Sequence, residues 1–160
     1  MSRSEKWGIY APAKGIVALA YNSQDYGLTV IIEYPCGTRT LHGHNSKLLV
    51  ETGDPVERDQ LIAIMGDTGK GIPRPNKHSH LGCIPKGKPL TGLKENCINP
   101  VPFLIKNECV YPTNTLVSNG FQEDYGNYLH EGIDFSGLEQ NIIKGWERSI
   151  NANTQIYYRR

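Results

Sequence analysis

The segments GIVALAYN (residues 15–22) and GLTVIIEY (residues 27–34) decide the fold, because both are rich in β-branched and aromatic residues. Such residues favour strands, and the four residues SQDY (23–26) between the two segments predict a tight connection. A second turn at PCG (residues 35–37) leads into a third expected strand over residues 38–44. Short loops between successive strands indicate an antiparallel meander and not βαβ units.

The rest of the chain extends this β pattern. A turn at Gly53 and a short buried strand over residues 60–65 come next, followed by a surface loop over residues 67–76. Residues 101–105 suggest a short helical turn. Near the end, Ile142, Ile143, Trp146 and Ile150 recur at helix-like spacing, which predicts a short amphipathic helix within residues 138–160. The expected fold class is therefore mainly β, a compact antiparallel sheet in a single domain of residues 1–160.

Length, charge and composition exclude some functional classes. The 160 residues carry 17 Lys plus Arg against 16 Asp plus Glu, a net charge of +1, which argues against a dedicated nucleic-acid binder. No run of apolar residues approaches the roughly 20 that a membrane span needs. The first seven residues, MSRSEKW, lack the apolar region of a secretory signal peptide, so we expect synthesis in the cytoplasm without signal-dependent secretion.

The four cysteines form no CxxC pair. Cys36, Cys83, Cys97 and Cys109 lack the spacing of a zinc finger, and nothing in the sequence signals an oxidising compartment. Buried thiols are favoured over disulfides, although Cys97 and Cys109 could close a loop.

Histidines carry the strongest chemical signal. His78 and His80 are two residues apart, so an extended backbone places both on one face of a strand. His130 is followed four residues later by Asp134. A hydrolytic zinc site uses about three protein ligands and an open position for water, and His80, His130 and Asp134 would supply two nitrogens and one carboxylate oxygen. A single anionic ligand leaves the ion net positive and able to lower the pKa of bound water.

These residues lie in motifs that resemble a known family. HEGID (residues 130–134) matches H-x-G-x-D, HSH (residues 78–80) matches H-x-H, and His44 precedes Asn-Ser in the third expected strand. The sequence resembles the lysostaphin-type, LytM-like zinc endopeptidases, which cut peptide cross-links in bacterial peptidoglycan. Supporting matches across residues 8–137 are YAPAKGIV (10–17), YG (26–27), GDPV (53–56), QLIA (60–63) and GDTG (66–69).

The resemblance implies a cofactor, Zn²⁺, and a role for each site residue. His80, His130 and Asp134 would bind the zinc ion, while His44 and His78 would flank the metal-bound water. One of these two would act as general base and the other would stabilise the tetrahedral intermediate, and the resemblance does not say which. Tyr125 or Tyr128 would help to hold that intermediate.

The order of the motifs departs from the family. Relatives carry H-x-G-x-D before the Ala-Pro-x-x-Gly strand, whereas here it lies near the C-terminus, so the motif order is circularly permuted. A strand core over residues 7–105 would then carry H-x-H, residues 111–137 would supply His130 and Asp134, and residues 138–160 would form a tail. Alternatively, the C-terminal part completes the site of a neighbouring molecule, which would make the protein a homodimer.

Some single positions also differ from the residues usual in the family. Ser79, Leu81 and Asp59 replace residues usual in relatives, and His42 stands where an aromatic residue is common. We expect His42 to lie on the same strand face as His44 and to support or pack against the site, a role favoured over direct ligation.

The expected function is that of a zinc metalloendopeptidase hydrolysing peptide bonds in bacterial peptidoglycan. The alternative is a catalytically silent relative that binds the cell wall or scaffolds a partner. With wall-directed chemistry and no signal peptide, the sequence favours a phage-derived lysin, released by lysis, exported by a non-classical route or carried in a phage particle. The bond that is cut is left open.

Overall fold

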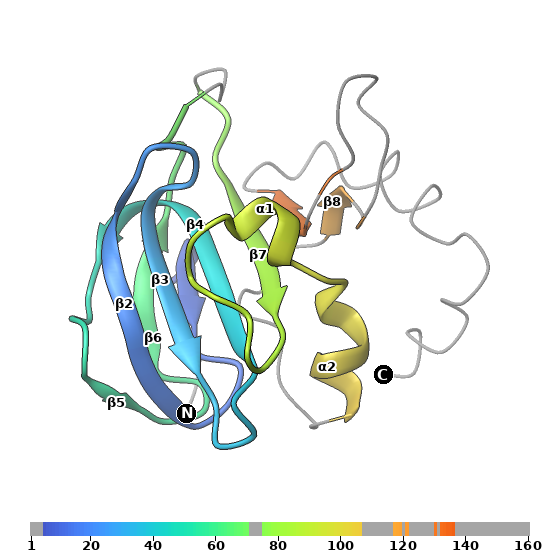
Figure 1. Ribbon diagram of the computed structural model, residues 1–160. Helices are drawn as coiled ribbons and strands as arrows, with labels where there is room; N and C mark the ends of the chain where they lie inside the picture. Colours follow the sequence, from blue (N-terminus) through green and yellow to red (C-terminus); the bar gives the residue numbers. More distant parts are fainter. Residues whose placement is uncertain are drawn as a thin grey trace.

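A computed structural model of the chain describes residues 5–70, 75–106, 117–119, 121, 130 and 132–136. Its centre is the expected meander of β2 (Gly15–Ser23), β3 (Gly27–Glu33) and β4 (Arg39–Leu48), which lie side by side in Figure 1. Ser23 pairs with Gly27 where the β2–β3 hairpin closes. The hairpin predicted from residues 15–34 is therefore confirmed.

A curled antiparallel sheet surrounds this meander. Its main path runs β5-β2-β3-β4-β7-β9-β8, while β6 pairs with both β1 and β4. The remaining strands are β1 (Gly8–Tyr10), β5 (Pro55–Val56), β6 (Leu61–Met65), β7 (His78–Ile84), β8 (Val117–Asn119) and β9 (Ile133–Ser136). All pairings are antiparallel, so the predicted fold class is confirmed.

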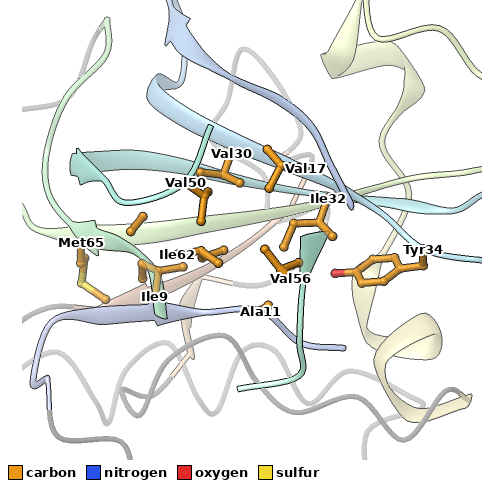
Figure 2. Packing of buried hydrophobic residues seen from close by; sticks show 11 residues of the cluster. Ile9, Ala11, Val17, Val30, Ile32, Tyr34, Val50, Val56, Ile62 and Met65 are labelled. Atoms are coloured by element: carbon orange, nitrogen blue, oxygen red, sulfur yellow. The ribbon is translucent and has the colours of Figure 1, made fainter. Parts of the chain in front are cut away.

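The main core fills the curl of the sheet. Figure 2 shows Val17 and Val30 of the meander lying across from Ile9 and Ala11 at β1. Val30, Ile9 and Ala11 are fully buried. Burying a valine or isoleucine side chain fully contributes about 1.5–3 kcal/mol, so this cluster stabilises the strands that carry the site.

Two short helices follow β7. The turn expected at residues 101–105 is α2 (Pro100–Lys106), and its Leu104 packs with Leu81, Ile133 and Phe135 on one face of the sheet. Figure 1 also shows α1 (Leu93–Asn96), which the sequence analysis did not predict because four residues are too few to show helical periodicity. Where the structure describes the chain, no helix is long and apolar enough to cross a membrane.

Strand β4 is longer than expected because it changes partners midway. Residues 39–43 pair with β7, whereas residues 45–48 pair with β6. The register with β3 shifts across the same region, and His44 adopts a left-handed backbone with φ 62°. A β-bulge of this kind redirects the side chain that follows it.

The structure contradicts the expectation for His42, because of this bulge. Gly43 pairs directly with His80, and the two share one face of the sheet. His42 pairs with Leu81 and therefore lies on the opposite face. The His44 ring lies near His78 and His80. The prediction that His42 and His44 share one face is therefore wrong, because regular alternation ends at His44.

Other expectations lie partly or wholly outside the described residues. Cys83 is buried as expected, whereas Cys36 is exposed. Cys109, and with it the alternative of a Cys97–Cys109 loop, falls outside the described residues, as does the helix expected within residues 138–160.

Candidate active site

Three buried donor groups meet where β7 and β9 pair. His80 lies directly opposite Asp134 in the strand register. Nδ1 of His80 is 3.0 Å from Oδ1 of Asp134, and Nε2 of His130 is 3.2 Å from both that oxygen and His80 Nδ1. One ligand atom from each residue lies within 4.8 Å of the others. The structure thus brings together the three predicted ligands from segments some 50 residues apart in the chain.

A glycine makes this close approach feasible. A Cβ atom at Gly132 would lie 2.5 Å from both His80 Nε2 and the carbonyl oxygen of Leu81. Real Cβ atoms do not approach other atoms so closely, and the Leu81 oxygen belongs to the backbone and cannot swing away. The third position of HEGID is therefore glycine for a steric reason, since a side chain there would displace His80.

The electrostatics keep Asp134 ionised. Burial on its own would raise the pKa of this carboxyl group, but hydrogen bonds from His130 and His80 outweigh it and hold the pKa well below its usual range. Two imidazole nitrogens and one carboxylate oxygen are a donor set typical of a catalytic zinc site, which keeps a further coordination position for water or substrate. The residues present therefore fit a bound zinc ion.

His44 and His78 form the second half of the site. Their ring centroids are 4.6 Å apart, and the centroids of His44 and His80 are 5.9 Å apart. Nδ1 of His44 donates to the carbonyl oxygen of Thr68 at 2.8 Å, and Nδ1 of His78 donates to that of Asn76 at 2.9 Å. Because a carbonyl oxygen only accepts, Nδ1 of each ring carries a proton.

The surroundings keep His44 neutral. Burial, with smaller contributions from His78 and His80, lowers its pKa to about 4, against opposing effects of the Thr68 carbonyl and Asp134. A neutral imidazole at pH 7 can accept a proton from water.

Tyr26 is a site residue that the sequence analysis did not single out. Its buried ring lies 5.3 Å from that of His80 and 6.1 Å from that of His44, and its carbonyl oxygen accepts a 2.6 Å hydrogen bond from the His44 backbone. The signal available was that Tyr26 ends the predicted 23–26 turn and is the first residue of the supporting YG match.

The other expected positions lie elsewhere. His42 is fully buried behind the site, where its Nε2 lies 2.9 Å from the Thr40 hydroxyl, so it packs and does not ligate. Tyr125 and Tyr128 lie outside the described residues, and their proposed role stays a prediction.

The family model of peptidase family M23 matches residues 2–91. The chain belongs to peptidase family M23. The matched region contains His44, His78 and His80, and it ends before His130 and Asp134. The M23 match therefore covers the strand core and one of the three candidate ligands.

Two curated relatives are similar to the chain over part of their length. The chain is 33% identical over 88 residues to the peptidoglycan DD-endopeptidase ShyA of Vibrio cholerae serotype O1, a match covering 55% of this chain and 20% of that protein. It is 41% identical over 101 residues to the murein hydrolase activator EnvC of Escherichia coli K12, covering 63% of this chain and 22% of that protein. The chain thus spans about one fifth of the length of each relative.

Solved structures show the same fold. LytU matches with a TM-score of 0.53 and 26% identity, covering 64% of this chain and 66% of that chain. A putative glycyl-glycine endopeptidase lytM from Ruminococcus gnavus matches with a TM-score of 0.52 and 28% identity, covering 69% of this chain and 48% of that one. The lysostaphin-type peptidase fold expected from the motifs is confirmed.

Proposed function

We propose that this M23 protein is a zinc-dependent endopeptidase that hydrolyses peptide bonds in bacterial peptidoglycan. One observation carries the proposal: three buried donor atoms from His80, His130 and Asp134 cluster beside the rings of His44 and His78. The similarity to a peptidoglycan DD-endopeptidase supports the class of substrate.

His80 would bind the metal through Nδ1, His130 through Nε2 and Asp134 through Oδ1. When bound there, zinc supplies a Lewis acid that lowers the pKa of water and polarises a carbonyl group. Ionised Asp134 contributes the single negative charge of the donor set. Burial of the three residues excludes bulk water, which strengthens each electrostatic interaction within the site.

His44 and His78 would share the remaining work. The lone pair on Nε2 of a neutral ring takes a proton from the attacking water, and the other ring, protonated on Nε2, donates a hydrogen bond to the charge that develops on the scissile carbonyl group. Nδ1 of each ring donates to a backbone carbonyl oxygen, so these hydrogen bonds leave the assignment of the two roles open.

The test combines metal analysis with wall hydrolysis. Purified protein should contain stoichiometric zinc and reduce the turbidity of bacterial cell walls, and His80→Ala and Asp134→Ala should lose both properties. His42→Phe is the matched control, because it removes a buried histidine from β4 outside the donor set. Absence of zinc from the wild type, or clearing that survives both alanine substitutions, would contradict the proposal. Mass spectrometry of the released fragments then identifies the bond that is cut.

A second candidate is a catalytically silent relative that acts through a partner. The similarity to a protein named as a murein hydrolase activator supports it. Such a protein would clear walls only in the presence of a separate murein hydrolase, whereas an endopeptidase clears them alone.

The place of action stays a prediction. Release by lysis, non-classical export and delivery in a phage particle are separated by fractionating a producing culture into cells, medium and particles and probing each fraction for the protein.

A further inference from the structure

The hydroxyl group of Thr68 joins two strands at the bulge. Thr68 Oγ1 accepts a hydrogen bond from the backbone nitrogen of Leu28 at 3.0 Å and donates one to the backbone oxygen of Asn45 at 2.6 Å. Leu28 lies on β3, and Asn45 is the first residue after His44 on β4. This single hydroxyl therefore fixes the loop after β6 to both strands where the sheet is irregular.

Thr68 also contacts His44 through its own backbone. Its carbonyl oxygen accepts the proton of His44 Nδ1 at 2.8 Å. If His44 instead carried its proton on Nε2, the lone pair of Nδ1 would face the lone pairs of this carbonyl, which is repulsive. The carbonyl group thus selects the tautomer that leaves Nε2 able to accept a proton.

Close packing holds the loop against the β2–β3 turn. A Cβ atom at Gly27, where φ is +61°, would lie 2.2 Å from Thr68 Oγ1. At Gly69, where φ is +107°, it would lie 2.6 Å from the Asp25 oxygen. The backbone nitrogen of Lys70 donates to the carbonyl oxygen of Gln24 at 3.0 Å. With both glycines present the loop lies directly on the turn, so the Thr68 carbonyl has little freedom to move.

A second side chain reinforces the same bulge. Nδ2 of Asn45 donates to the carbonyl oxygens of Leu28 and His42, each at 2.8 Å. The Asn45 side chain thus secures the backbone at the bulge, as the Thr68 hydroxyl does, whereas the Thr68 carbonyl also contacts the imidazole ring of His44.

We propose that Thr68 is a positioning residue for His44: its hydroxyl holds its own carbonyl against Nδ1 and thereby fixes the ring orientation and the Nδ1–H tautomer. The kinetic consequence rests on the proposed peptidase function, whereas the tautomer does not. A residue that positions a ring acting only in the transition state, as proton acceptor or as stabiliser of the developing charge, affects turnover more than substrate binding.

The experiment compares Thr68→Val with Thr68→Ser in the zinc-loaded protein. Valine keeps the shape of threonine and removes the hydroxyl, while serine keeps the hydroxyl. Long-range ¹H–¹⁵N spectra of the histidine rings report which nitrogen carries the proton. We expect Nδ1–H at His44 in the wild type and Thr68→Ser, and a mixture of tautomers in Thr68→Val. We expect kcat to fall about tenfold to hundredfold in Thr68→Val with little change in KM, and Thr68→Ser to restore it.

Thr52→Val is the matched control. Thr52 Oγ1 also accepts a backbone hydrogen bond, from Ala20 at 2.9 Å, but on an exposed part of the sheet. Its removal should leave the His44 tautomer and kcat unchanged.

Several outcomes would overturn the proposal. It fails if Thr68→Val keeps the wild-type tautomer and kcat, or if valine and serine cause equal losses. It also fails if the unmodified protein carries the His44 proton on Nε2, a measurement that needs no folded variant. Because the spectra are read without substrate, an inactive wild-type protein would contradict the peptidase function and leave the tautomer result standing.

Discussion

Nδ1 of His80 lies 3.0 Å from Oδ1 of Asp134, and the two residues face each other in the register of β7 and β9 although 54 positions separate them in the chain. A neighbouring pair in a sheet has little freedom to drift apart. The candidate metal site is therefore part of the strand pairing, so we expect loss of one to affect the other.

Asp134→Asn tests the role of negative charge at this pair. The amide keeps the size of the carboxylate but removes the negative charge from the donor set that the described residues form, so we expect zinc affinity to fall at least tenfold. Zinc at one hundred times its dissociation constant should stabilise the wild type by about 2.7 kcal/mol, because it binds the folded state. Melting curves with and without zinc measure the effect. A variant that zinc stabilises as strongly as it does the wild type would contradict the assignment of Asp134 as a ligand.

Gly132→Ala tests the steric argument at HEGID. The added Cβ would lie 2.5 Å from His80 Nε2 and from a backbone oxygen, so His80 must move away from its partners. We expect zinc affinity to fall about tenfold to hundredfold. Gly43→Ala is the matched control, since Gly43 pairs with His80. A Cβ atom added at Gly43 would have the Tyr26 side chain as its nearest neighbour, at 3.2 Å. Equal zinc affinities in the two variants would refute the argument.

Mixing two inactive variants tests whether the site lies within one chain. In the structure β7 and β9 of the same chain pair. We therefore expect an equimolar mixture of His80→Ala and Asp134→Ala to stay inactive, even after joint refolding. If sites formed between chains, a mixed dimer would contain one intact donor set. Recovered activity would then favour the homodimer over circular permutation within one chain.

Acid stability should depend on His42. Burial lowers the pKa of this side chain from 6.5 to about 3, so between these values the unfolded state binds a proton that the folded state does not. The free energy of unfolding should therefore decrease as pH falls below 6.5, by up to about 1.4 kcal/mol per pH unit from this group. Denaturant titrations of wild type and His42→Phe at pH 7 and pH 5 measure how much the free energy of unfolding of each protein changes between the two pH values. This change should be smaller in the phenylalanine variant. An equal change in the two proteins would count against a neutral buried His42.

The regular part of the fold could be predicted because its signals are local. Residues 15–34 contain two strands and their turn within a single stretch, and the structure has both strands there. His78 and His80 share a face because β7 is regular, as the two-residue spacing predicts. The three candidate ligands followed from residue type and motif.

The irregular part of the site could not be predicted because its causes are distant in sequence. The face of His44 depends on where β4 changes its partner from β7 to β6, which no local pattern around residues 42–45 reveals. The hydroxyl of Thr68 is bonded to residues 40 and 23 positions away. Tyr26 joins the site only once the β2–β3 turn lies over β4. Tertiary pairing, and not propensity, determines each of these positions.

The boundary of the family match divides the donor set. Residues 2–91 contain both candidate proton acceptors and His80, while His130 and Asp134 come from β9 and the residues just before it. The matched region alone therefore holds one of the three candidate donors. Membership of the family does not by itself supply the donor set, which is complete only when the short segment of residues 130–134 meets β7.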